Sequence, residues 1–303
     1  MNTRAEHAMS HSIRLIPLFT LLGLVTSASP TPPTPDAPRG SLVIVGGGDR
    51  SESMMRRFVE LAGGRGARIA VVPNASSEPE ETGRTLVAEL DSLGARAFIY
   101  HLDRAAASLE ASARRLDSAT GIWFSGGDQA LVTQALAGTP VQRAMQRRYR
   151  QGAVVGGTSA GAAIMSDSMI TGNQTPPGDT TGYYGDEYPA IARHRVEIVP
   201  GLGFLPQAIV DQHFISRERH NRLLSAVLER PALLGVGIDE STALEVGPDG
   251  RWRVLGESAV VIYDARRAHV TEGKRPLLGA TGLSLHVLPA GAAFDPRSGG
   301  GDL

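Results

Sequence analysis

The stretch AVVGGTSAGAAIM, from Ala153 to Met165, joins an apolar run to a glycine-rich turn and then to small, mostly apolar residues. The apolar residues at its start are typical of a buried strand, and its alanine-rich end can begin a helix. Between them, residues 157–161 fit the pattern G-x-S-x-G, whose glycines permit a crowded turn that lifts the central hydroxyl above a sheet. Ser159 is therefore a candidate nucleophile. A structural serine in a tight turn has the same pattern, so its partners must decide.

Short apolar runs alternate with helical patterns on either side of this stretch. The segment 80–93, for example, places Leu86, Leu90 and Leu93 at helical spacing. This alternation predicts an α/β fold, a three-layer sandwich with a mostly parallel central sheet and a nucleophile elbow. The expected strands are 42–45, 68–72, 97–102, 121–124, 153–155, 208–210 and 235–238, and the expected helices are 53–62, 80–93, 109–118 and 130–136.

Polar and glycine-rich segments follow several of these strands. In open α/β sheets, sites form at the carboxyl ends of the strands, so we expect these segments to meet there. Gly46-Gly47-Gly48 follows the first strand, but Ser51 stands where the dinucleotide fingerprint G-x-G-x-x-G requires glycine. We therefore expect this turn to let the backbone pass close to the site and not to bind a nucleotide.

The composition is that of a soluble globular protein, with 42% hydrophobic and 20% charged residues. Lys and Arg number 30 and Asp and Glu 31, and the resulting net charge of −1 argues against a nucleic-acid partner. The chain has no cysteine, which excludes disulfides, a cysteine nucleophile and thiolate metal sites. The motif H-E-x-x-H does not occur, and we expect neither a metal nor a cofactor.

The N-terminal residues have the pattern of a secretory signal peptide. Arg4 and Arg14 supply positive charge, residues 16–25 form a short apolar run, and residues 26–28 (TSA) form a small-residue cleavage site. The apolar run is too short to span a bilayer comfortably. We expect cleavage after Ala28, a periplasmic or extracellular protein, and no membrane contact after cleavage. A disordered or buried N-terminal helix is the alternative interpretation.

The chain is accordingly divided into four segments. A signal peptide is expected over 1–28 and an extended, proline-rich linker over 29–40. One folded domain is expected over 41–288. The segment 289–303 is rich in Gly, Ala and Pro and is expected to be disordered.

A serine nucleophile needs a base, and the base needs an acid that orients it. His213 ends the polar triplet Asp211-Gln212-His213, which directly follows a short apolar strand and so occupies an active-site position in this architecture. Asp239 and Glu240 follow another apolar strand, and the residues alone do not choose between them. The order Ser, His, acid differs from the order Ser, acid, His of the α/β-hydrolases.

Four motifs occur in order along the chain: GGDQ (126–129), GGTSAGA (156–162), DQHF followed by R-x-R-x-x-R (211–222), and GIDE (237–240). Two weaker ones are IVGGGD (44–49) and VPNAS (72–76). In this combination the sequence resembles the cyanophycinase branch of the serine peptidases that also include dipeptidase E. The resemblance extends from about residue 41 to about residue 261, nearly the whole expected domain.

The resemblance implies a serine peptidase with a defined catalytic set. It makes Ser159 the nucleophile, His213 the general base, and Glu240 the member of the acidic pair that orients the base. The backbone N–H groups of Ala160 and Gly127 are then expected to stabilise the oxyanion.

The substrate that the resemblance implies is cyanophycin (multi-L-arginyl-poly-L-aspartate), an aspartate backbone with arginine on each β-carboxyl. The expected reaction is exopeptidase release of β-Asp-Arg dipeptides through an acyl-enzyme. Arginine side chains can hold a carboxylate bidentately, and acids can meet a guanidinium. The implied substrate-binding residues are Gln129, Asp211, Gln212, Arg217, Arg219 and Arg222.

Several alternatives stay open at this point. The arginines also fit a solvated helix face, where Glu218 and Arg222 have the i,i+4 spacing of an ion pair. The polar segment 171–188 fits either a substrate-gripping flap or a disordered insertion. The function alternatives are a peptidase for other acidic or isoaspartyl peptides and a non-catalytic peptide-binding homologue. A homodimer is compatible with the sequence.

Overall fold

The computed structural model describes residues 38–174, 190–271 and 276–303, which lie in one compact unit from Pro35 to Leu303. The expected signal peptide and most of the expected linker lie outside the described residues, and so does most of the expected loop over 171–188. Among the helices of the described residues, none has the length and apolar character needed to cross a membrane.

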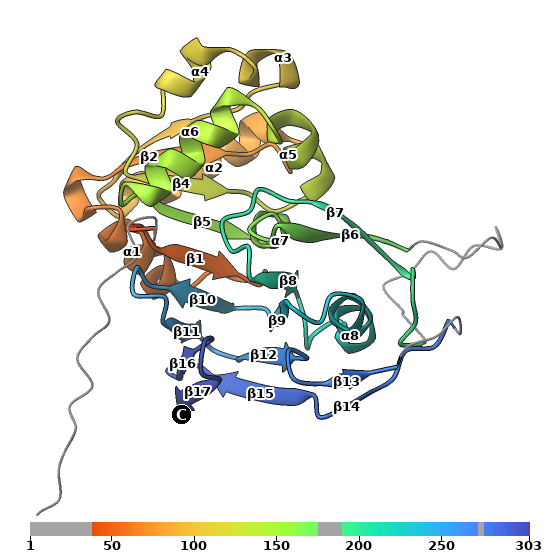
Figure 1. The fold of residues 1–303 in the computed structure, drawn as a ribbon. Coiled ribbons are helices and arrows are strands. Elements are labelled where there is room, and N and C mark those ends of the chain that lie inside the picture. Colours follow the sequence, from red (N-terminus) through yellow and green to blue (C-terminus); the bar gives the residue numbers. More distant parts are fainter. Residues whose placement is uncertain (1–37, 175–189, 272–275) are drawn as a thin grey trace, which may run out of the picture. The chain divides into compact units, whose positions relative to one another are not determined.

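The central sheet contains β1 (Leu42–Val45), β2 (Arg68–Val72), β3 (Arg96–Ile99), β4 (Gly121–Phe124), β5 (Val154–Thr158), β10 (Thr242–Val246), β11 (Trp252–Gly256), β16 (Ala293–Asp295) and β17 (Gly300–Asp302). In the described residues the strand order is β17-β16-β11-β10-β1-β5-β4-β2-β3 (Figure 1). The strands from β1 to β3 in this order pair in parallel, and β10 begins an antiparallel extension. The expected α/β class with a mostly parallel central sheet is confirmed.

Helices cover both faces of this sheet because successive residues of each strand point to opposite faces. In β1, Val43 and Val45 join the core beneath the first two helices, whereas Leu42 and Ile44 join the core on the other face. The first face carries α1 (Glu52–Leu61), η1 (Gly64–Gly66) and α2 (Pro79–Ser92), and the second carries α3 (Arg104–Ala107), α4 (Glu110–Arg114), α5 (Gln129–Leu136), α6 (Pro140–Arg150) and α7 (Ala160–Ala163). The helix expected over 109–118 is shorter in the structure, where α4 ends at Arg114.

A second sheet holds two of the expected strands. It has the order β15-β12-β9-β8, in which β8 and β9 are parallel and the other pairs antiparallel. Its strands share the larger core with the central sheet through Val210, Val236 and Ile238. The bounds of its strands and of the helix between β8 and β9 are β8 (Ala208–Gln212), α8 (His220–Glu229), β9 (Leu234–Ile238), β12 (Ala259–Asp264) and β15 (Ser284–Pro289). Two short antiparallel pairs complete the described strands: β6 (Ser168–Gln174) with β7 (Val196–Pro200), and β13 (His269–Val270) with β14 (Ala280–Thr281).

The disorder expected for 289–303 is wrong, because β16 and β17 extend the central sheet. Phe294 is 3% exposed and packs against Trp252, with ring centroids 5.8 Å apart. One buried aromatic side chain thus anchors a segment whose glycines suggested no structure.

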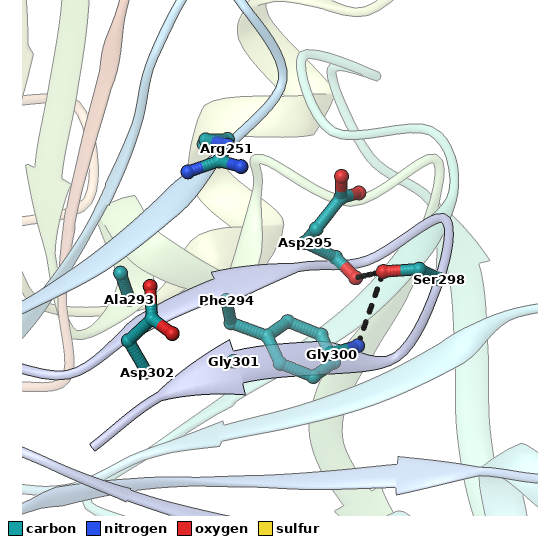
Figure 2. A pocket seen from close by; sticks show the side chains of 8 residues that line it. All are labelled: Arg251, Ala293, Phe294, Asp295, Ser298, Gly300, Gly301 and Asp302. Carbon is teal, nitrogen blue, oxygen red and sulfur yellow. Dashed lines mark hydrogen bonds between the residues drawn. The ribbon is translucent and has the colours of Figure 1, made fainter. Parts of the chain in front are cut away.

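A pocket of about 270 Å³ lies between Arg251 and this hairpin, and it contains none of the predicted catalytic residues (Figure 2).

Candidate active site

Ser159 lies at the sharp turn between β5 and α7. Its backbone has φ 55° and ψ −111°, a conformation that is strained for a residue with a side chain. The turn also needs glycine on both sides. A Cβ at Gly157 would lie 2.6 Å from the carbonyl oxygen of Gly161, and a Cβ at Gly161 would lie 2.6 Å from that of Phe124. The G-x-S-x-G pattern thus reflects a crowded strand–turn–helix that leaves the Ser159 side chain partly exposed.

His213 reaches this serine from the second sheet. Its Nε2 is 2.9 Å from Ser159 Oγ, and its backbone N–H donates to the carbonyl of Gly46 at 2.8 Å. The imidazole rests on Gly47, where a Cβ would lie 2.2 Å from the ring carbon Cε1. Gly47 has φ +120°, which also favours glycine. The backbone of the turn after β1 therefore passes close to the site, as expected. The lack of a side chain at Gly47 leaves room for the histidine ring.

The two acids that the sequence left open point to different partners. Glu240 Oε1 is 2.5 Å from His213 Nδ1. The Asp239 carboxylate instead accepts hydrogen bonds from the N–H and Oγ of Ser216, from the N–H of Ile215, and from Ser258 Oγ, at distances of 2.8–3.1 Å. Asp239 thus fastens the chain that follows His213. Sequence reasoning did not find this role of Asp239. It considered Asp239 only as an alternative to Glu240, because the two acids are adjacent.

Charges around His213 act on its pKa in both directions. Burial lowers the pKa most strongly, the hydrogen bond and charge of Glu240 raise it, and the charges of Arg217 and Arg219 lower it, with a net fall below the ordinary histidine value. The neutral imidazole, which can accept a proton, is therefore favoured at neutral pH. For Asp239, burial opposes ionisation, but hydrogen bonds from Ser216, Ser258 and the backbone outweigh it and lower the pKa.

The glycine loop after β4 lies beside the elbow. A Cβ at Gly126 would lie 3.5 Å from the Cβ of Ser159. Gly127 has φ +131°, and a Cβ there would lie only 1.9 Å from the carbonyl oxygen of Ala75, so this position requires glycine. Ala160, the other predicted oxyanion donor, is the first residue of α7 and directly follows Ser159. The structure thus brings both predicted donor residues to the neighbourhood of the serine.

The DQHF and arginine motifs are placed differently from what we expected. Asp211 and Arg222 form an ion pair between β8 and α8, and each side chain is 1% exposed. Gln212 and Arg219 are also buried, and Arg219 Nη1 donates to both the backbone and the side-chain oxygen of Gln212 at 2.9 Å. Asp211 and Arg222 thus bury their charges against each other, and their expected contact with substrate stays a prediction. Arg217 is exposed.

Gln129, at the start of α5, is buried and makes contacts within the chain. Its Nε2 donates to the carbonyl oxygens of Ile170 at 3.0 Å and Thr171 at 2.5 Å. It therefore joins the GGDQ loop to β6. Of the expected flap or insertion over 171–188, residues 171–174 belong to this strand, and residues 175–189 lie outside the described residues.

No group of three or more His, Cys, Asp or Glu side chains suited to hold a metal ion occurs in the part of the chain that the structure describes. The chemistry that the site supports is that of its hydrogen-bonded chain from Ser159 through His213 to Glu240. Such a chain can transfer the hydroxyl proton to the imidazole and hold the resulting cation beside a carboxylate.

The sequence is similar to a known protein family and to known proteins over most of its length. Residues 42–251 match the family profile of peptidase family S51. The chain is 36% identical over 272 residues to a cyanophycinase of Synechococcus elongatus, with 86% of this chain and 80% of that protein covered. Cyanophycinases of Trichormus variabilis and Geminocystis herdmanii are 34% and 33% identical, and the matches cover 86% of this chain and 87% and 95% of those proteins.

A solved structure shares the fold. The crystal structure of a peptidase from an acI-B1 Actinobacterium matches with a TM-score of 0.64 at 22% identity, and the match covers 86% of this chain and 98% of that chain. The family profile begins at β1, and its range includes Ser159, His213 and Glu240. The chain therefore belongs to peptidase family S51 and is a serine-type peptidase similar to cyanophycinases.

Proposed function

We propose that the chain is an exopeptidase that hydrolyses cyanophycin and releases β-Asp-Arg dipeptides through an acyl-enzyme. The observation that carries the proposal is the pair of hydrogen bonds from Ser159 Oγ to His213 Nε2, at 2.9 Å, and from His213 Nδ1 to Glu240 Oε1, at 2.5 Å. The curated relatives named cyanophycinase support the choice of substrate, since they match over 86% of this chain.

In the proposed reaction, His213 Nε2 accepts the hydroxyl proton while Ser159 Oγ attacks the carbonyl carbon of a backbone amide. The N–H groups of Ala160 and Gly127 stabilise the oxyanion of the tetrahedral intermediate. Collapse breaks the C–N bond, and His213 gives its proton to the leaving amine. A water molecule then loses a proton to His213 and attacks the ester. As the ester C–O bond breaks, His213 gives this proton to Ser159 Oγ, which frees the serine and releases the carboxylic acid product. Glu240 holds the imidazole in the required tautomer throughout.

Incubation of the purified protein with insoluble cyanophycin tests this function. We expect soluble β-Asp-Arg to accumulate, and we expect Ser159→Ala to lower the rate on the order of 10⁴-fold or more. Covalent labelling by a serine-directed acylating reagent should disappear in the same variant. Hydrolysis by Ser159→Ala at the wild-type rate would exclude this serine as the nucleophile.

A second candidate is a peptidase for other acidic or isoaspartyl peptides. The exposed Arg217, which lies close enough to influence the pKa of His213, favours a substrate with a free carboxylate. Simple aspartyl dipeptides in the same assay separate the two candidates. Cleavage of these dipeptides without release of β-Asp-Arg from the polymer would support the second candidate and contradict the first.

We also propose that the protein is exported. The proposal rests on the charged, apolar and small-residue pattern of residues 1–28. N-terminal sequencing of the protein recovered from its native host should find a chain that starts after Ala28. A mature protein that keeps residues 1–28 in the cytoplasmic fraction would refute export.

A further inference from the structure

A pocket of about 450 Å³ opens beside the elbow and takes no part in the proton transfer described above. Its wall includes Thr158, which precedes Ser159, and Gly126, whose Cβ would lie 3.5 Å from the Cβ of Ser159. The rest of the wall comes mainly from the turn after β2 and the first two turns of α2. This volume lies within the range of small-molecule sites and is ample for one amino-acid side chain.

Most of the pocket lies on the other side of the nucleophile from the base, and Arg50, in the loop after β1, completes its wall. In the central sheet, β5 has β1 on one side and β4, then β2, on the other. His213 rests on Gly47, in the turn after β1. The pocket instead extends toward the ends of β4 and β2, where Ser125 and Ser76 line it. A substrate bound across Ser159 can therefore reach into the pocket without displacing the imidazole.

The charges in the pocket favour a cation. Glu78 and Glu81 are exposed carboxylates on its wall, and neither makes an ion pair or side-chain hydrogen bond with another described residue. The cation that lines the pocket, Arg50, is already paired with Glu89, with 2.9 Å between Nη2 and Oε2. Negative charge is thus in excess, and neighbouring Ser and Thr hydroxyls add further acceptors for N–H groups.

Acidic residues in the first turn of a helix often serve only to complement the helix dipole. Two observations point beyond that role here. Glu78 occupies the N-cap position of α2, yet its side chain makes no capping hydrogen bond. Ser125, which lines the pocket, is 1% exposed, and its Oγ has no hydrogen-bond partner among the described residues. A buried polar atom without a partner is uncommon, and a donor from a bound ligand would satisfy it.

We propose that this pocket is a subsite that binds a guanidinium side chain of the substrate through Glu78 and Glu81. The inference rests on the proposed function, in which every aspartate of the polymer carries an arginine. A guanidinium presents five N–H donors in a planar fork, which suits two carboxylates surrounded by hydroxyls. The subsite would draw one arginyl branch to the side of Ser159 away from His213 and so align the backbone amide for attack.

Steady-state kinetics with the variants Glu78→Gln and Glu81→Gln test the subsite. For a short soluble β-Asp-Arg oligomer, we expect KM to rise about tenfold in each variant with kcat little changed, because a charge-assisted contact is lost from an exposed wall. An oligomer with citrulline in place of arginine should show no such dependence. The matched control is Glu80→Gln, which alters the same helical turn at a residue outside the pocket and should leave KM unchanged.

Direct binding separates failure of the subsite from failure of the proposed function. L-Arginine titrated into the intact protein should bind more tightly than L-citrulline, and the double variant Glu78→Gln/Glu81→Gln should abolish the difference. Equal binding of the two ligands by the wild type would overturn the subsite even if the polymer is hydrolysed. Hydrolysis with an unchanged KM in both variants would also overturn it. A wild-type protein that leaves cyanophycin intact would instead contradict the proposed function.

Discussion

Replacing Glu240 by Gln removes the charge that faces His213 while keeping the size of the side chain. The contact is short, at 2.5 Å between Nδ1 and Oε1, and a hydrogen bond to a charged group contributes about 1.5–3 kcal/mol. Solvent screens part of this, because 38% of the Glu240 side chain is exposed. A contribution of about 2 kcal/mol corresponds to about 30-fold in rate. A glutamine amide that donates to Nδ1 also favours the wrong tautomer.

We therefore expect Glu240→Gln to lower kcat/KM about 10²-fold, less than the roughly 10⁴-fold loss known for a buried acid in this role. The pH profile gives a second readout. Glu240 raises the pKa of His213, so its neutralisation lowers that pKa further, and the acid limb of activity should move to lower pH.

The assay is release of soluble dipeptide from cyanophycin by wild type and variant across the acid and neutral range. Glu110→Gln, an exposed acid on α4, is the matched control and should leave both rate and profile unchanged. A wild-type rate in Glu240→Gln, or an acid limb displaced to higher pH, would refute the assignment of Glu240 as the orienting acid.

Three further outcomes follow from the packing around the site. Gly47→Ala should lower kcat at least about tenfold, because its Cβ would lie 2.2 Å from a ring carbon of His213; Gly64→Ala, also at positive φ but with open space around it, should keep wild-type kinetics. Asp211→Asn should destabilise the fold by about 3–5 kcal/mol in chemical denaturation, since it removes the charged carboxylate that pairs with the buried guanidinium of Arg222. A loss below about 1 kcal/mol would show that the pair is not buried in solution. Asp239→Asn should cost about 1–3 kcal/mol at neutral pH. Because the folded-state pKa of Asp239 is lowered, this difference should vanish as pH falls through that pKa; a pH-independent difference would contradict the role of its charge.

Local sequence patterns predicted most of the central sheet. β1 and β4 were expected at the observed residues, since each is a short apolar run buried on both faces. The same reasoning failed for β16 and β17. Their glycines and prolines suggested disorder, but one buried aromatic, Phe294, and pairing with β11 stabilise them. Pairing between strands distant in sequence has no local signature, so composition alone could not reveal it.

For the site, the sequence supplied the candidates but not all of their roles. Asp239 and Glu240 are adjacent and chemically alike, yet one fastens the loop after His213 and the other faces the imidazole. Likewise, Asp211 and Arg222 belong to one charged motif that looked suited to substrate, and the fold turns both inward. Side-chain direction at a strand end depends on the neighbouring sheet and helix, which the motif does not encode.

The sequence by itself determined the elbow, because the crowding around Ser159 is local and only glycine at 157 and 161 relieves it. It also determined the parallel strands of the central sheet, since burial on both faces requires continuous apolar runs. Only the tertiary structure decided which acid meets His213, which charges are buried, and where the pocket beside Ser159 has two carboxylates without an ion-pair partner among the described residues. Those properties arise where two sheets and the turns after several strands converge, and they depend on distances between residues far apart along the chain.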